Sequence, residues 1–184
     1  MLNPYCWLSP KAQKQLWFGS LVISAVSLLA IKVLDESLVN DAAPSGIISF
    51  EFARSIARAR QILASWDAGE KLRCALSLGI DYLFLVAYAV FISLGCVYIA
   101  NALKIGRPFL AKIGLLLGWA QFLAALLDAI ENTALIQLLL GSRNELFAWI
   151  AWGCAGLKFT LVGLGLAYMV SGFIFARVLL RGST

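Results

Sequence analysis

The stretch Gln121–Asn132 reads QFLAALLDAIEN and lies inside an apolar run from about Phe109 to Leu140. A run of this length can form a helix that crosses a bilayer, which takes about 20 apolar residues. The stretch also carries Asp128, Glu131 and Asn132. Carboxylates are costly inside a membrane and usually face a bundle interior or a cavity. The stretch therefore predicts a transmembrane helix that contributes to a buried polar site.

Three further apolar runs, at about 15–34, 72–103 and 147–176, have the length of transmembrane helices. Of the 184 residues, 61% are hydrophobic and only 14% are charged. Soluble domains are nearer half apolar and about a quarter charged. The sequence therefore predicts an integral membrane protein of the all-α class. We expect a single four-helix transmembrane domain that spans residues 1–184.

The segment between the first two runs is polar, and within it residues 49–66 have the periodicity of an amphipathic helix. Ser49 can cap this helix, and Glu51 lies in its first turn. The apolar stripe consists of Phe52, Ile56, Ala59, Leu63 and Trp66. We expect this helix to lie on the membrane surface or over the mouth of the bundle, either as a packed surface helix or as a functional lid.

Several residues mark where the helices begin, end and pack. Asp67 with Glu70, and Ser142 with Glu145, each have the spacing of a capping box. Pro108 suits a first helical turn, and Gly141 suits a helix end. Small residues let membrane helices approach closely. The glycines expected to have this role are Gly114, Gly118, Gly156 and Gly163.

The distribution of charge predicts the orientation in the membrane. Four spans place both termini and the loop at 104–107 on one side, which then carries seven basic residues and no acid. These are Lys11, Lys14, Lys104, Arg107, Lys112, Arg177 and Arg181. The other side carries seven basic residues offset by seven acids. Positive charge close to span ends favours the cytoplasm, so we expect cytoplasmic termini in a bacterial inner membrane or a thylakoid-like membrane.

Several classes of function have little support. The net charge of +5 reflects this orientation, and no basic run with interleaved aromatic residues indicates nucleic-acid binding. There is no histidine and no CxxC pair, so the sequence predicts no cofactor, no metal site and no catalytic residue of a recognised type. Cys74 and Cys154 can lie near one membrane face, where a disulfide is one alternative and two free thiols are the favoured one.

Charged residues on three spans lie at similar depths. At 1.5 Å per residue, Asp81 lies roughly 12 Å from the outer end of its helix, Glu131 roughly 15 Å, and Asp128 and Lys158 roughly 20 Å. On the third span, Asp128, Glu131 and Asn132 share one helix face. We therefore expect one site in the outer half of the membrane, built from three helices.

The expected site has more acids than bases. Its residues are Asp81, Tyr88, Gln121, Asp128, Glu131, Asn132 and Lys158. Three carboxyls against one lysine leave two surplus negative charges, which protons, a cation, a ligand or water must compensate. Two interpretations stay open: a polar cluster that only fixes helix register, or a functional cavity open to the outer face.

Three segments, Asp81–Tyr88, Leu127–Asn132 and Leu157–Phe159, resemble a pattern in uncharacterised small four-span bacterial membrane proteins. The resemblance covers roughly residues 50–168. It implies a shared four-span architecture and a shared site, and it implies no activity.

Three hypotheses about function follow. In the first, the cluster binds or transports a proton, a cation or a small amphiphilic ligand from the extracytoplasmic side. In the second, the chain is an accessory or structural subunit of a larger membrane complex or a homo-oligomer. In the third, it is an enzyme acting on a lipid or isoprenoid, with Glu131 and Lys158 as an acid/base pair. The expected partners are the lipid bilayer and, in the outer half, a lipid or small ligand; nucleic acid is not among them.

Overall fold

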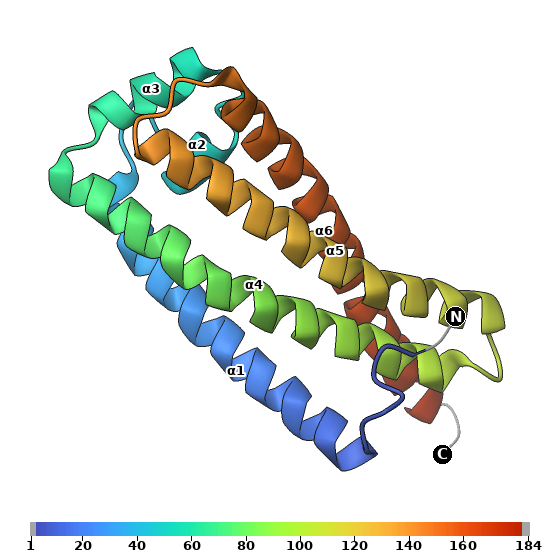
Figure 1. Cartoon of the computed structure of the whole chain (residues 1–184). Coiled ribbons are helices and arrows are strands. Elements are labelled where there is room, and N and C mark those ends of the chain that lie inside the picture. Colours follow the sequence, from blue (N-terminus) through green and yellow to red (C-terminus); the bar gives the residue numbers. More distant parts are fainter. Residues whose placement is uncertain (1–2, 182–184) are drawn as a thin grey trace.

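The computed structural model describes residues 3–181, with side chains as far as 174, and it is built from helices (Figure 1). Its long helices are α1 Pro10–Asp35, α4 Ala68–Leu103, α5 Pro108–Leu139 and α6 Glu145–Arg181. All four are long and apolar enough to cross a membrane. The predicted all-α four-helix membrane fold is therefore confirmed.

Helix α4 lies at the centre of the bundle. It packs against α1, α5 and α6, and α5 packs against α6. Helix α1 packs mainly on α4, through Ser20, Ser24 and Ser27, which are buried at helical spacing. Because these side chains are small, the two helices approach closely. Three helices, α4, α5 and α6, thus form the inner unit of the bundle.

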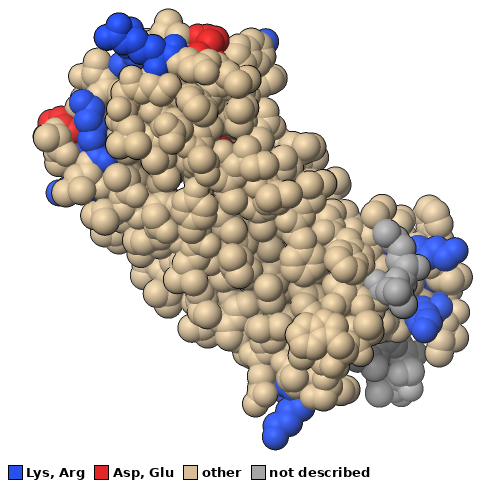
Figure 2. Space-filling view, in the orientation of Figure 1, with Lys and Arg blue, Asp and Glu red and all other residues tan. Residues whose placement is uncertain are grey.

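The two ends of the bundle differ in charge. In Figure 2 the acidic side chains on this face gather at the end that carries the short helices α2 and α3, among Lys and Arg, and basic side chains lie at the opposite end. Helix α1 begins and α6 ends at that opposite end (Figure 1). Of the basic residues expected there, Arg177 and Arg181 lie outside the described side chains.

Three of the predicted helix signals are confirmed. Asp67 and Glu70 form a complete capping box at the start of α4. Pro108 occupies the first turn of α5. Gly141, just after α5, has a φ of +96°, a conformation that glycine adopts without the steric penalty of a Cβ atom.

The second predicted capping box, Ser142 with Glu145, is wrong. At the start of α6, the Asn144 side chain accepts a hydrogen bond from the Leu146 amide at 3.0 Å. The Glu145 carboxylate instead accepts from the Ile56 amide at 3.1 Å, at the start of another helix. The first amides of a helix have no partner inside it, so Glu145 satisfies one of them across the tertiary structure.

The amphipathic helix predicted for residues 49–66 is confirmed only in its second part, because the chain breaks the helix before Ile56. The structure has two helices, α2 Ile47–Glu51 and α3 Ile56–Ser65. Between them Arg54 has a φ of 59°, and its guanidinium lies 5.0 and 4.8 Å from the ring centroids of Trp149 and Trp152. Attraction between a cation and two aromatic rings stabilises this break in the helix.

The start of α2 depends on Asp35 at the end of α1. The Asp35 carboxylate accepts a hydrogen bond from the Ile47 amide at 2.6 Å. Gly46 before it has a φ of 56°, and a Cβ atom there would overlap the Asp35 carboxyl group. Ser49, the expected N-cap, lies inside α2, and the cap of the following helix α3 is Ser55.

Residues 36–66 form a folded cap on the end of the bundle opposite the start of α1 (Figure 1). Phe50 and Trp66 are buried and make an edge-to-face contact with ring centroids 5.7 Å apart. The Trp66 indole donates to the Leu38 carbonyl at 2.9 Å. Helix α2 lies beneath α3 and contacts α5 and α6 (Figure 1), so the cap covers the inner unit.

The predicted packing glycines divide into two groups. A Cβ atom at Gly114 would overlap the Tyr168 phenol, and one at Gly118 would lie 3.3 Å from the Val97 side chain. These two glycines allow close helix contact, as predicted. Gly156 and Gly163 have open space around them, so a packing role within the bundle is wrong for them.

This difference gives a matched pair of variants. Gly114→Ala should destabilise the protein by about 1–3 kcal/mol, because Tyr168 must move and strain its hydrogen bond to the Leu110 carbonyl. Gly163→Ala should be neutral or stabilising by up to about 1 kcal/mol, because alanine favours the helix. Thermal unfolding of both variants in detergent measures the difference, and equal midpoints would contradict the packing role of Gly114.

Candidate functional site

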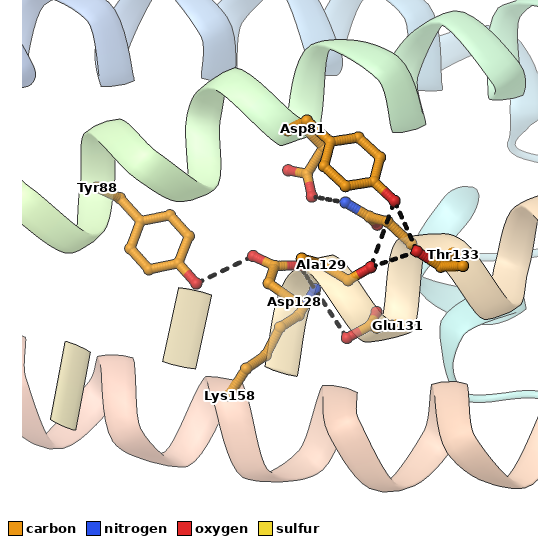
Figure 3. Close-up of polar contacts among 9 residues, drawn as sticks. Asp81, Tyr88, Asp128, Ala129, Glu131, Thr133 and Lys158 are labelled. Carbon is orange, nitrogen blue, oxygen red and sulfur yellow. Dashed lines mark hydrogen bonds and ion pairs between the residues drawn. The ribbon is translucent and has the colours of Figure 1, made fainter. Parts of the chain in front are cut away.

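Three helices of the inner unit converge on one buried polar cluster (Figure 3). Helix α4 contributes Asp81 and Tyr88, α5 contributes Asp128 and Asn132 together with Glu131, and α6 contributes Lys158. Six of the seven residues predicted for the site are thus brought together.

Lys158 lies at the centre of the cluster and contacts two carboxylates. Its ammonium lies 2.6 Å from Asp128 Oδ1 and 3.0 Å from Glu131 Oε2. All three side chains are buried, and Glu131 has no exposed surface. Spacing explains the arrangement, since residues three apart on α5 share a helix face. An ammonium withdrawn from water requires such partners, and these ion pairs connect α5 to α6.

Tyr88 completes the environment of Asp128. Its hydroxyl donates to Asp128 Oδ2 at 3.0 Å. Both carboxylate oxygens of Asp128 are therefore engaged, one by α6 and one by α4. Hydrogen bonds to a charged acceptor are stronger than neutral ones, so Tyr88 supports the contact between Asp128 and Lys158.

Asp81 lies at the edge of the cluster and is half-buried. The Asn132 amide donates to Asp81 Oδ2 at 2.6 Å. Beside this pair, the Tyr82 hydroxyl lies 2.9 Å from Thr133 Oγ1 (Figure 3). These contacts connect α4 to α5, and they do not involve Lys158.

Gln121, the seventh predicted residue, has a different role. Its amide nitrogen donates to the Leu117 carbonyl at 3.2 Å and to the Leu161 carbonyl at 3.0 Å. It packs beside Gly165, where a Cβ atom would overlap its amide group. Two helical turns from Asp128, Gln121 joins α5 to α6, and no contact with the charged cluster is observed.

Glu51 belongs to the site and was not predicted there. It is the last residue of α2, within the cap, and is only 8% exposed. The next residue, Phe52, stacks on Phe159 with ring centroids 6.0 Å apart, and Phe159 follows Lys158 in the chain. Glu51 is close enough to Lys158, Asp81 and Asp128 to interact with their charges.

The sequence does contain a signal for this burial. Residues 46–53 read GIISFEFA, so Glu51 is the only charged residue in an octapeptide that is apolar apart from Ser49. A solvated helix has a charged face, and this segment has none. The residues after Glu51 have an amphipathic pattern. The predicted helix therefore included Glu51 in its first turn, where the residue was expected to be exposed.

The buried charges are more unbalanced than the sequence indicated. Glu51, Asp81, Asp128 and Glu131 give four carboxyls around one ammonium, that of Lys158. Among the described residues, Glu51 Oε2 and Glu131 Oε1 are buried and accept no hydrogen bond. Glu51 and Glu131 thus each have an oxygen without a partner, whereas both oxygens of Asp128 are engaged.

Glu51 lies outside the membrane-spanning helices, and its environment favours the neutral acid. Burial raises its pKa to about 7. Lys158 opposes this shift in pKa, and the nearby acids Asp81, Asp128 and Asp35 reinforce it. A carboxyl with this pKa exchanges its proton near neutral pH.

Buried carboxyls that lack a hydrogen-bond donor are able to exchange protons. Asp128 and Glu131 are already engaged by Lys158, and among the described residues no group of three or more acids or cysteines is arranged to hold a metal ion.

The cysteines are free, with Cys74 and Cys96 buried, so the favoured alternative of unpaired thiols at Cys74 and Cys154 is confirmed.

Comparisons of the chain with protein-family models, with curated proteins and with solved structures found no match. The resemblance to small four-span bacterial membrane proteins stays an expectation. Function is therefore inferred from the geometry of the cluster.

Removing the only ammonium of the cluster should destabilise the fold. We expect Lys158→Met to lower the stability by about 3–5 kcal/mol, because Asp128 and Glu131 lose their counter-ion in a buried site. Thermal unfolding in detergent measures this effect.

The Lys158→Met/Asp128→Asn/Glu131→Gln variant should recover much of the loss, since it also removes the two carboxylates. Lys112→Met, which removes an exposed ammonium, is the control and should be neutral. A Lys158→Met protein as stable as the wild type would contradict a central role for this ion pair.

Proposed function

We propose that this membrane protein binds and releases a proton at the buried cluster of Glu51, Asp81, Asp128 and Glu131, with Lys158 as the fixed counter-ion. The observation that supports this proposal is the excess of carboxyls. Lys158 already contacts two of them, and Glu51 and Glu131 each retain a buried oxygen without a hydrogen-bond donor.

A proton is the compensating ion that suits this geometry best. Carboxyls that share a buried site repel each other when ionised, so they hold a proton between them. Glu51 and Glu131 are close enough for their charges to interact. Protonation removes the charge of either group, and the new O–H donor can be shared with a neighbouring carboxyl, so no cavity large enough for a hydrated cation is required.

We propose that the proton reaches the cluster through the cap. Glu51 is supplied by α2, which lies between the first two spans. The opposite end of the bundle carries basic residues without acids, which favours its location in the cytoplasm. On this orientation the proton enters from the extracytoplasmic side at Glu51 and reaches Glu131 beside Lys158.

Proton uptake by the purified protein tests the proposal. When a weakly buffered sample is stepped from alkaline to acidic pH, a pH-indicator dye should record buried carboxyls taking up protons near neutrality. Asp128→Asn/Glu131→Gln should move this component to lower pH, because Glu51 is then the acid beside Lys158 that compensates its charge, which favours ionised Glu51.

Asp67→Asn/Glu70→Gln is the matched control, since it removes two carboxyls that lie outside the buried cluster, at the start of α4. It should leave the neutral-pH uptake in place. An unchanged uptake in the Asp128→Asn/Glu131→Gln protein would refute proton binding at the cluster.

The stability of the protein should depend on pH through Glu51. Its pKa is about 7 in the folded protein against 4.5 for a free glutamate, so between these values the folded state binds more protons than the unfolded state. Stability must then fall as pH rises from 4.5 to about 7. At about 1.4 kcal/mol per pKa unit, the loss is on the order of 3 kcal/mol.

Glu51→Gln should remove this loss, so that the variant gains stability over the wild type above pH 7 and not below pH 4.5. Glu36→Gln, at an exposed glutamate in the same cap, should follow the wild-type curve. Thermal midpoints across the pH range measure the effect, and parallel wild-type and Glu51→Gln curves would exclude a titrating Glu51.

A structural subunit of a larger membrane complex is the second candidate. The observation that favours it is the pairing itself, since Lys158 with Asp128 and Asn132 with Asp81 connect the three inner helices. In that case the acids affect folding and assembly alone, and the proton uptake described above is missing. The lipid-modifying enzyme is not favoured, because Glu131 and Lys158 contact each other within the core.

A further inference from the structure

A second polar site lies at the capped end of the bundle, apart from the carboxylate cluster. Here α3, the start of α4 and the turn between α5 and α6 enclose an open cleft of about 670 Å³. Three basic side chains line it, one from each of these elements: Arg60, Lys71 and Arg143. Segments distant in the sequence thus present three like charges to one space.

Convergence of like charges is unfavourable unless an anion or water compensates it. No acidic residue lines the cleft. Among the described residues, no carboxylate lies within ion-pairing distance of Arg60, Lys71 or Arg143. Of the acids near these residues in the sequence, Asp67 and Glu70 are engaged in the capping box of α4. Glu145, two residues after Arg143, accepts a hydrogen bond from the Ile56 amide. The cleft therefore has a net positive charge without an internal counter-ion.

The walls of the cleft are amphipathic. Polar groups of Gln61 and Ser142 accompany the basic residues, and the half-buried Leu63 and Leu139 also line it. The next residue, Leu140, is 77% exposed. Because α5 spans the membrane and ends here, the cleft lies where the acyl region of a bilayer meets its headgroups.

We propose that this cleft binds the phosphate headgroup of an anionic membrane lipid, with the lipid chains against the leucines. The two guanidinium groups can each donate two parallel hydrogen bonds to phosphate oxygens, and Lys71 adds a third positive charge. Gln61 and Ser142 supply further polar contacts. The proposal is independent of proton binding, since none of its residues belongs to the carboxylate cluster.

Lipid titration of the full-length protein in non-ionic detergent tests the proposal, with thermal stabilisation as the measure of binding. Dioleoyl phosphatidic acid should raise the unfolding midpoint, and dioleoyl phosphatidylcholine, which has no net charge, should raise it far less. The Arg60→Gln/Lys71→Gln/Arg143→Gln variant should need about ten-fold more phosphatidic acid for half of the effect, because each basic residue contributes to anion binding.

The matched control is Lys32→Gln/Arg73→Gln/Lys112→Gln, which removes the same charge from exposed positions outside the cleft. It should bind phosphatidic acid like the wild type. Arg143→Gln alone, in the turn after α5, should weaken binding by a smaller factor, and it provides the test if the triple variant fails to fold. Equal effects of the two lipids, or an equal loss in the control triple, would overturn the site.

Inorganic phosphate and glycerol 3-phosphate test whether the cleft binds a lipid headgroup or a soluble phosphate compound. Weak effects of both, beside a strong effect of phosphatidic acid, support a lipid headgroup. If either soluble compound stabilises the wild type as strongly as the lipid and loses its effect in the cleft triple, the lipid is the wrong ligand.

Discussion

The ion pairs of Lys158 are the interaction on which the inner unit depends. The Lys158 ammonium on α6 is buried with two carboxylates on α5. It lies 2.6 Å from Asp128 and 3.0 Å from Glu131. Desolvation of such groups is costly, and only close pairing offsets it. Sliding or rotating either helix would separate the charges, so the pair fixes the register of α5 against α6. Tyr88 extends the same constraint to α4 through Asp128.

The cap adds a fourth carboxyl to this cluster, which favours a functional role over a purely structural one. Were it only a structural ion pair, one lysine with one acid would suffice, yet α2 carries a further carboxyl, that of Glu51, into the core. Its insertion requires a helix break, which Arg54 stabilises between Trp149 and Trp152, and an anchor at Asp35 for the first amide of α2. Contacts outside the cluster thus hold Glu51 in the core, although its ionised form destabilises the fold. Loss of stability at a few residues is typical of functional sites.

The sequence predicted the long helices and most of the site, because both follow from strong local patterns. Apolar runs define the spans, and the positions of Asp81, Asp128, Glu131 and Lys158 within them set common depths. The cap was harder to predict. Its two short helices depend on tertiary partners, since Arg54 adopts a positive φ beside aromatic rings of α6. Gln121 was assigned to the site from helix spacing. Spacing cannot reveal that the Gln121 amide donates a hydrogen bond to the Leu161 carbonyl of α6. The basic cleft joins three distant segments and has no local pattern.

The position of Lys158 in the last span has a consequence for the biogenesis of the protein. During synthesis α5 emerges before α6, so the carboxyls of Asp128 and Glu131 reach the membrane before their counter-ion exists. A helix with two unpaired acids partitions poorly into lipid. The turn that joins α5 to α6 is only a few residues long, and the two helices pack against each other. We therefore expect α5 and α6 to integrate as a hairpin, with Lys158 accompanying the acids into the bilayer.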